Sequence, residues 1–243
     1  MRAGAGTSAE SGIPTFRGAG ATPEAFVRDP SLVWEFYHWR REVVSRSKPN
    51  KAHFALAALE KRCKDEGKKL TLITQNIDRL HQAAGSKSII ELHGSLWDVC
   101  RADMQGYWSD DQKPWEDRTQ PLVPALQGQG APDVEKHANI PLKKLPHDSQ
   151  GQLLRPGVVW FGEGLDPDVL AEAAEALQTC DLFMTIGTSS VVYPAAGFAA
   201  QIAARGVPLA EVNLDTSGAT DICKYVFQGK AGEILPELLD VTV

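Results

Sequence analysis

Cysteine is scarce in this chain of 243 residues, and its spacing excludes two common architectures. The four cysteines are Cys63, Cys100, Cys180 and Cys223, and no two of them form a CxxC pair. A disulfide-stapled domain and a structural zinc site built from cysteine pairs both need closer spacing. The sequence therefore predicts a fold that forms in a reducing compartment and relies on a hydrophobic core.

Two further absences limit the partners. No run of about 18 apolar residues occurs, which is the length a membrane-spanning helix requires. Acidic residues outnumber basic ones, with 31 Asp and Glu and 25 Lys and Arg. Phosphate groups are bound by clustered basic side chains, so we expect neither nucleic acid nor membrane as a partner. No targeting segment is visible ahead of the first glycine-rich motif at Gly4.

Short apolar runs alternate with helical segments, as in the βαβ units of a parallel sheet. We expect helices over residues 30–45 and 166–178, one from Asn50 to near Gly67, and one that Pro194 opens and Gly206 ends. The predicted fold class is α/β, a Rossmann-like doubly wound parallel sheet with a small inserted module. Its strands are expected at residues 70–74, 89–92, 158–161, 182–186, 209–212 and 225–227.

One long segment interrupts this alternation. Residues 103–152 are rich in Asp, Gln, Pro and Gly and carry little periodic hydrophobicity. A structureless loop of that length is uncommon inside a compact domain. We therefore expect residues 103–152 to form the inserted module, and residues 1–102 and 153–243 to form the main domain.

Polar motifs follow the predicted strands. In open parallel sheets, ligands bind beyond the carboxyl ends of the strands, so residues placed there are candidates for contacts. The glycines at the start of the chain suit a backbone that approaches a phosphate closely. Each motif is weak alone, because a polar residue after a strand is more often part of a turn. They comprise Gly4-Ala5-Gly6, Thr74-Gln75-Asn76-Ile77-Asp78, Leu92-His93-Gly94, Gly187-Thr188-Ser189 and Asn213-Leu214-Asp215.

The ordered combination of these motifs resembles the sirtuin family over nearly the whole chain. It includes Val-Val-Trp-Phe-Gly-Glu at residues 158–163 and Ser-Gly-Ile-Pro-Thr-Phe-Arg at residues 11–17. The resemblance implies an NAD-dependent enzyme that removes acyl groups from protein lysines. In that chemistry the acyl oxygen attacks the ribose carbon as nicotinamide leaves, and a histidine takes a proton from a ribose hydroxyl. Nicotinamide, free lysine and O-acyl-ADP-ribose are the products.

The resemblance also assigns roles to residues of this chain. His93 matches the catalytic base, and residues 159–163 match a stretch that pairs with the backbone of the substrate. The substrate stretch comprises Val159, Trp160, Phe161, Gly162 and Glu163. The implied NAD contacts are Gly4, Ala5, Gly6, Thr7, Glu10, Phe16, Arg17, Gln75, Asn76, Ile77, Asp78, Gly187, Thr188, Ser189, Asn213, Leu214, Asp215 and Ala231.

Tyr37 and Arg40 indicate which acyl group is removed. They lie three residues apart, so on a helix they share a face, where Arg can hold a carboxylate through two hydrogen bonds. A solvated helical face has the same spacing. Tyr-x-x-Arg at this place resembles the mitochondrial class of sirtuins that removes succinyl, malonyl and glutaryl groups. We therefore expect an acyl-lysine substrate with an acidic acyl group.

The chain departs from the family pattern in three places. Only residues 1–3 stand where the family has a hydrophobic strand, and the cofactor loop after Arg17 is short. We expect loss of that strand to expose its two neighbours in the sheet. The family's zinc cysteines are missing, and Cys100 with Asp103, His147 or Asp148 makes a poor zinc site. We expect NAD as cofactor and no zinc.

Two alternatives remain at this point. Ordinary deacetylation keeps the NAD site and His93, while a non-catalytic remnant that binds ADP-ribose or acyl-lysine accounts for the three departures. The resemblance favours a mitochondrial location, with the cytoplasm or nucleus as the other options.

Overall fold

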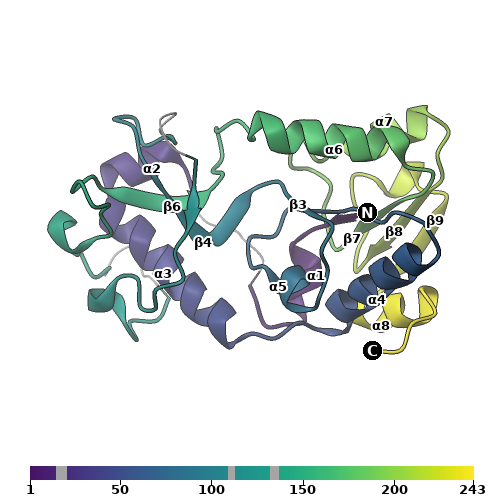
Figure 1. Ribbon diagram of the computed structural model, residues 1–243, viewed down its shortest axis with the longest axis horizontal. Helices are drawn as coiled ribbons and strands as arrows, with labels where there is room; N and C mark the ends of the chain where they lie inside the picture. The colour runs from purple at the N-terminus through teal and green to yellow at the C-terminus, as the bar shows by residue number, and fades with distance from the viewer. Residues whose placement is uncertain (15–20, 109–112, 132–136) are drawn as a thin grey trace. The chain divides into compact units, whose positions relative to one another are not determined.

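The structure is a computed structural model that describes residues 1–14, 21–108, 113–131 and 137–243. The chain forms two compact units (Figure 1). The first unit comprises residues 1–16, 47–92 and 166–243, and the second comprises residues 17–46 and 93–165. Residues 103–152, the proposed inserted module, lie within the second unit.

The first unit is built on a parallel sheet of six strands, in the order β3-β2-β1-β7-β8-β9. This confirms the predicted fold class. Strand order runs outward in both directions from β1, so the sheet is doubly wound. The strands are β1 (Arg2–Ala3), β2 (Leu72–Thr74), β3 (Ile89–Glu91), β7 (Phe183–Ile186), β8 (Leu209–Asn213) and β9 (Tyr225–Gln228).

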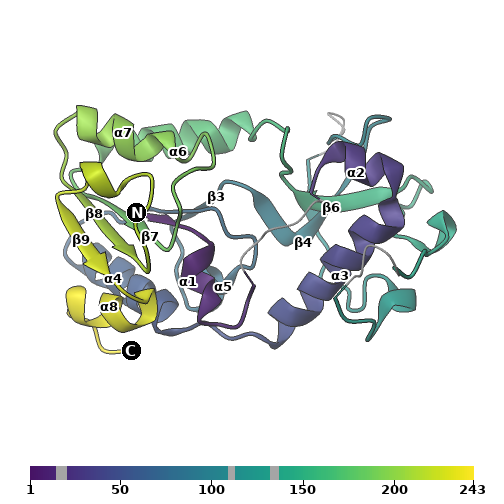
Figure 2. The ribbon, with the colours of Figure 1, turned by 180° about the vertical axis from the view of Figure 1, so that it is seen from behind.

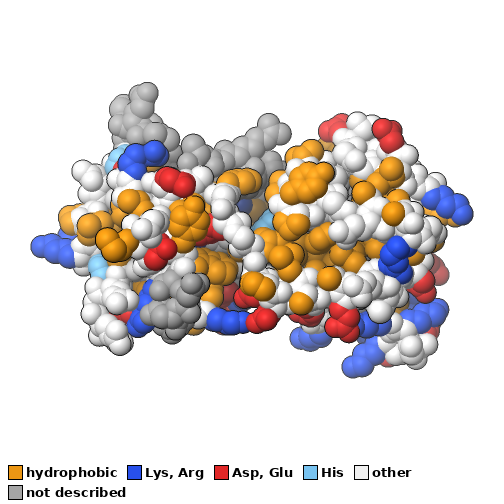
Figure 3. Space-filling view, turned by 90° about the horizontal axis from the view of Figure 1, so that it is seen from above, with side chains coloured by type: hydrophobic (Ala, Val, Ile, Leu, Met, Phe, Trp, Pro, Cys, Tyr) orange, Lys and Arg blue, Asp and Glu red, His pale blue; other side chains and the backbone are white. Residues whose placement is uncertain are grey.

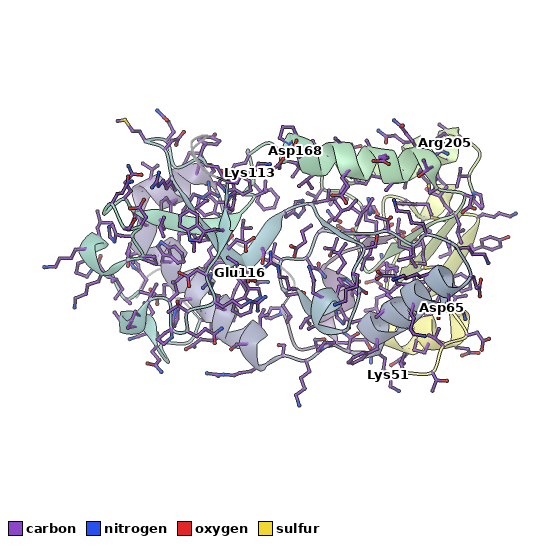
Figure 4. The ribbon with its side chains drawn as sticks, in the orientation of Figure 1. Lys51, Asp65, Lys113, Glu116, Asp168 and Arg205 are labelled. Carbon is purple, nitrogen blue, oxygen red and sulfur yellow. The ribbon has the colours of Figure 1, made fainter. Side chains whose placement is uncertain are left out.

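Helices cover both faces of this sheet. Figure 1 shows α6 (Pro167–Thr179) and α7 (Gly197–Ala204) on one face, and α4 (Lys51–Asp65) and α8 (Ala231–Leu238) on the other. Figure 4 labels Lys51 and Asp65 at the two ends of α4. Leu56 of α4 and Leu235 of α8 join the buried side chains of the sheet in one core. Shorter elements of this unit are α1 (Ala5–Ala9), α5 (Leu80–Ala83) and η3 (Thr220–Ile222).

Strand β1 is only two residues long, yet it pairs on both sides. Arg2 and Ala3 align with Ile73 and Thr74 of β2, and also with Thr185 and Ile186 of β7. The strand is therefore truncated, as expected, but it is not lost, and the expectation that its two neighbours are exposed is wrong. The buried guanidinium of Arg2 also donates to the Ala195 carbonyl and the Ser190 hydroxyl, beyond the end of β7.

The second unit is an antiparallel sheet, in the order β5-β4-β6, packed against a long helix. Its strands are β4 (Gly94–Arg101), β5 (Trp115–Glu116) and β6 (Leu154–Val158), and its helices are α2 (Pro23–Arg28), α3 (Pro30–Arg46), η1 (Pro124–Leu126) and η2 (Leu142–Lys144). Helix α3 packs against this sheet (Figure 2). Two hydrogen bonds hold it there: the Trp34 indole donates to the Leu154 carbonyl at 2.9 Å, and Arg41 donates to the Leu96 carbonyl at 2.8 Å.

Two predicted elements are displaced. Of residues 158–161, only Val158 is in a strand, because β6 and its pairing with β4 end there. The chain then turns, with the Glu163 amide donating to the Trp160 carbonyl. Helix α7 begins at Gly197 and not at Pro194, because the Gly197 and Phe198 amides bond three residues back, in the manner of a turn. The other predicted helices and strands are present, with ends shifted by a few residues.

Charges of both signs share the surface that Figure 3 shows, where Lys and Arg side chains lie among Asp and Glu. Within the described ranges, no helix has the length and apolar character needed to cross a membrane.

Asn50 joins α4 to the glycine-rich segment and provides a test of this arrangement. Its carboxamide oxygen accepts from the Ala52 amide at 2.9 Å, while its Nδ2 donates to the Thr7 carbonyl at 2.8 Å and to the Ser11 hydroxyl at 3.0 Å. Asn50→Ala removes both the helix cap and this connection, so it should lower the free energy of unfolding by about 2–3 kcal/mol.

Asn50→Asp is the matched control, because it keeps the capping oxygen and loses only the donor. Its loss in urea unfolding should be clearly smaller than that of Asn50→Ala. Equal losses would mean that the bonds to Thr7 and Ser11, and not the cap, carry the stability.

Candidate active site

The chain reverses its direction of winding between β1 and β7, and the loops after these strands pack closely together. A Cβ on Gly4 would lie 2.6 Å from the Thr188 Cβ, and one on Gly6 would lie 2.9 Å from the Gly187 Cα. Gly187 has φ +57°, and a Cβ there would lie 2.5 Å from the Thr7 amide nitrogen. These glycines are therefore required for the two loops to meet. Ligands of doubly wound sheets bind at this switch point.

Side chains beyond the strand ends bond to one another across this region. The Thr188 hydroxyl donates to the side-chain Oε1 of Gln75 at 3.2 Å, and the side-chain Nδ2 of Asn213 donates to the Thr188 backbone carbonyl at 3.0 Å. Asn76 donates to the Gly4 carbonyl at 3.1 Å. Residues at or just beyond the carboxyl ends of β1, β2, β7 and β8 thus form one polar cluster, as the sequence motifs predict.

A buried histidine missed by sequence analysis supports this cluster. His53 Nδ1 accepts from the Asn50 amide, so the proton lies on Nε2, 3.3 Å from the Ser8 hydroxyl. The same hydroxyl accepts from Asn76 at 3.0 Å. Burial lowers the pKa of His53 to about 3, and that of the adjacent His81 to about 4, so both rings are neutral at pH 7. The Asn-x-x-His capping pattern was the available signal.

The remaining expected cofactor residues are placed as follows. Thr7 donates to the Ile186 carbonyl, Glu10 accepts from the Gly232 amide next to Ala231, and Asp78 accepts from the Leu80 amide. Ser189, Leu214 and Asp215 are exposed, Ala5 is exposed on α1, and Ile77 is partly exposed beside Asn76. Phe16 and Arg17 lie outside the described residues.

In the second unit, His93 lies directly before β4, beside the predicted substrate stretch. The His93 carbonyl accepts from the Val159 amide at 3.0 Å, and Gly94 pairs with Val158. Gly94 has φ +69°, and a Cβ there would lie 2.4 Å from the Gly157 carbonyl oxygen. The backbone around His93 therefore has little freedom relative to residues 158–159.

Tyr37 on α3 contacts Trp160 of the predicted substrate stretch, and Arg40 follows three residues later on the same helix. The Trp160 indole donates to the Tyr37 hydroxyl at 2.8 Å. Tyr37 and Arg40 are both buried, and the Arg40 guanidinium carbon lies 5.7 Å from the centroid of the Phe36 ring. Burial raises the pKa of Tyr37 to about 12, although the hydrogen bond from Trp160 and the charges of Arg155 and Arg40 act in the opposite direction. The phenol is thus a neutral hydrogen-bond donor beside a guanidinium.

A buried ion pair shapes residues 159–163. Arg155 Nη1 and Nη2 donate to the two carboxylate oxygens of Glu163 at 2.5 and 3.0 Å. The same guanidinium lies 3.5 Å from the centroid of the Trp160 ring. Beyond Trp160 the chain turns outward, because Phe161 is 54% exposed and Gly162 has φ +90°.

These arrangements fit NAD but not zinc. The polar cluster at the switch point offers amide, hydroxyl and carboxylate groups of the kind that bind a dinucleotide. For zinc, the described residues contain no group of three potential ligands. Cys100 is buried, and its thiol faces the Pro156 carbonyl at 4.0 Å.

The comparisons with known proteins agree with this geometry. The model of the Sir2 family matches residues 4–194. That is more than three quarters of the chain, so the chain belongs to the Sir2 family, and the predicted resemblance is confirmed.

Two animal relatives share the name NAD-dependent protein deacylase sirtuin-5, mitochondrial. The protein of Canis lupus familiaris is 51% identical over 251 residues, covering 97% of this chain and 79% of that protein. The protein of Danio rerio is 51% identical over 252 residues, covering 98% and 80%. An NAD-dependent protein deacylase of Thermococcus kodakarensis is 43% identical over 248 residues, covering 97% and 87%.

Solved structures with similar folds carry ligands. A complex of a Sir2 homolog with NAD has a TM-score of 0.78 at 40% identity, covering 98% of this chain and 86% of that one. A Sir2 mutant bound to a p53 peptide and NAD has a TM-score of 0.78 at 31% identity, covering 98% and 90%.

His93 provides the test of the site. His93→Ala should lower acyl-peptide turnover by about 10²–10⁴, the usual effect of removing one acid–base group. The far-ultraviolet circular dichroism and melting temperature should remain close to those of the parent. His147→Ala is the control, because it removes an exposed imidazole from the same unit. Turnover by His93→Ala at the parental rate would exclude His93 as the base.

Proposed function

We propose that this chain is an NAD-dependent protein-lysine deacylase with a preference for succinyl, malonyl and glutaryl groups. The names of the relatives support NAD-dependent deacylation of protein lysines in general. The acyl preference is carried by one observation, a buried Tyr37 hydroxyl next to Arg40 on α3. The products are nicotinamide, free lysine and O-acyl-ADP-ribose.

Bound NAD supplies the ribose carbon that receives the acyl oxygen and the nicotinamide that leaves. This chain's own residues bind, orient and move protons around it. Gln75, Asn76 and Asp78 would contact the nicotinamide side, and Gly187 and Thr188 the adenosine side. His93 would hold the proton taken from a ribose hydroxyl, a task suited to imidazole because its ordinary pKa lies near neutral pH.

The substrate backbone would pair with residues 159–163 in an extended form. Main-chain hydrogen bonds of this kind tolerate many peptide sequences. The affinity for a protein therefore depends mainly on the acyl-lysine, and the acyl group is read by α3.

An acidic acyl group fits Tyr37 and Arg40 better than an acetyl group does. Removing a guanidinium from water carries a cost that a carboxylate partner offsets through charge-assisted hydrogen bonds. An acetyl group supplies no such partner. The phenol of Tyr37 adds a neutral hydrogen bond to the same carboxylate.

Two alternative functions can be distinguished from this proposal by measuring nicotinamide release. A plain deacetylase would release nicotinamide with acetyl peptides as fast as with succinyl peptides, and a non-catalytic ADP-ribose or acyl-lysine binder would release none. The names of the sirtuin-5 relatives support a mitochondrial location for this chain.

Arg40→Met tests the acyl preference. It should lower kcat/KM for a succinyl-lysine peptide by about 10²-fold or more, because a site built around a polar substrate group discriminates strongly. The kcat/KM for the acetyl peptide should change little or rise. Tyr37→Phe should act in the same direction more weakly, since it removes one neutral hydrogen bond.

Arg46→Met is the matched control, because Arg46 is exposed at the end of the same helix. It should leave both rates unchanged. If Arg40→Met reduced the two rates equally, Arg40 would support the helix without reading the acyl group.

A further inference from the structure

The Tyr37 hydroxyl has a fixed hydrogen-bond partner on one side. The Trp160 indole N–H donates to it at 2.8 Å, and the relative exposures of Trp160 and Tyr37 are 2% and 1%. An indole nitrogen only donates, so the phenol oxygen is the acceptor in this bond. The phenol proton must therefore point away from Trp160.

The indole itself is held by three neighbours. The Arg155 guanidinium stacks on its ring, the Phe26 ring lies 5.6 Å away between centroids, and the Glu163 carboxylate accepts from the Trp160 backbone amide at 2.6 Å. Arg155 also donates to the carbonyls of Gly106 and Val158 at 2.8 Å. Rotation of the indole away from Tyr37 would break this packing.

We propose that Trp160 is a positioning residue for acyl recognition, because it makes Tyr37 a preorganised donor for the carboxylate of the acyl group. A hydroxyl that rotates freely would have to be ordered when the substrate binds, and that ordering costs affinity. The inference rests on the proposed acyl preference and adds the residue that sets the direction of the Tyr37 hydrogen bond.

A double-mutant cycle tests this role. Trp160→Phe keeps an aromatic ring on Arg155 and removes the indole N–H. It should lower the ratio of kcat/KM for succinyl over acetyl peptides by about 3- to 10-fold, the effect of one hydrogen bond. In a Tyr37→Phe background the same change should alter that ratio less than about 2-fold, because the two residues act through one bond.

Two results would overturn the proposal. One is an equal loss on both peptides, which would indicate a merely structural role. The other is a loss of selectivity that is as large in the Tyr37→Phe background as in the parent. If Trp160→Phe folds poorly, replacing Trp160 by benzothienylalanine removes only the N–H and gives the same comparison.

Failure of this inference can be told apart from failure of the proposed function. If Arg40→Met lowers the succinyl-to-acetyl ratio and neither Trp160 variant does, only the positioning role is wrong. If Arg40→Met also leaves the ratio unchanged, the acyl preference itself is wrong.

An independent observation concerns two turns of the second unit, which share one hydrogen-bond pattern. Asp103 Oδ1 accepts from the amides of Gln105 and Tyr107 at 2.9 and 2.8 Å. Asp148 Oδ1 accepts from the amides of Gln150 and Gln152 at 2.8 and 2.9 Å. In both turns the aspartate amide donates to the carbonyl four residues later, and a glycine with positive φ, Gly106 or Gly151, stands at the fourth position.

These turns stand where the sirtuin resemblance places the two zinc-binding cysteine pairs, one after His93 and one before Trp160. An ion pair joins them, because Arg101 Nε donates to Asp148 Oδ2 at 2.7 Å, with exposures of 17% and 7% for the two side chains. The Asp148 carboxylate is therefore already occupied by these three donors.

We infer that the two aspartate turns and the Arg101–Asp148 ion pair perform the structural task of a zinc ion in this chain. Each aspartate orders its own turn, and the ion pair connects the two. A metal would need the same carboxylate oxygens and a thiolate from Cys100, so the residues present do not fit it.

Chelation and mutation together test this inference. The purified untagged chain should contain far less than one zinc per molecule, and a zinc chelator should shift its melting temperature by less than about 1 °C. Asp148→Ala should lower the melting temperature by about 4–8 °C, since it removes charge-assisted bonds to two amides and to Arg101. Asp148→Asn, which keeps an oxygen for the amides, should lower it less.

A zinc content near one per molecule, or a clear fall in melting temperature on chelation, would contradict the inference. So would an Asp148→Ala variant that melts with the parent, because the turn would then contribute nothing to stability.

Discussion

The pairing of a two-residue strand on both of its sides is the constraint on which the first unit depends. β1 joins β2 and β3 to β7, β8 and β9, so its hydrogen bonds make one sheet out of two halves. The switch point exists only because β1 and β7 are neighbours. The close contact of Gly4 and Gly6 with Gly187 follows from that pairing, and it brings the polar strand ends together.

In the second unit, the buried Arg155 links the backbone of residues 158–163 to the side chains proposed to recognise the acyl group. Arg155 pairs with Glu163 and stacks on Trp160, which bonds to Tyr37. Removing both charges of an ion pair from water costs free energy that offsets much of their attraction. We therefore expect the Arg155–Glu163 pair to act mainly by fixing one conformation of residues 158–163. The same stretch bonds to the His93 carbonyl through Val159. The proposed base, the proposed substrate stretch and the residues proposed to recognise the acyl group thus belong to one connected structure.

Much of the fold and of the polar cluster could be predicted from the sequence. The strands of the parallel sheet are short apolar runs, and the motif residues follow them directly. Helix α3, the cap at Asn50 and the clustering of Gln75, Asn76 and Thr188 were predicted on that basis. Strand β6, an edge strand of its sheet, was missed, because Leu154-Arg155-Pro156-Gly157 has neither alternation nor an apolar run. His53 and the paired aspartate turns were missed because their roles depend on neighbours distant in the sequence.

The central claim is that this chain transfers acidic acyl groups from lysine to NAD-derived ADP-ribose. It is tested most directly by measuring nicotinamide released by the unmodified chain, with paired peptides that differ only in a succinyl or an acetyl lysine. The account predicts NAD-dependent release with a kcat/KM for the succinyl peptide at least about tenfold above that for the acetyl peptide. Equal rates, or no release with either peptide, would contradict it.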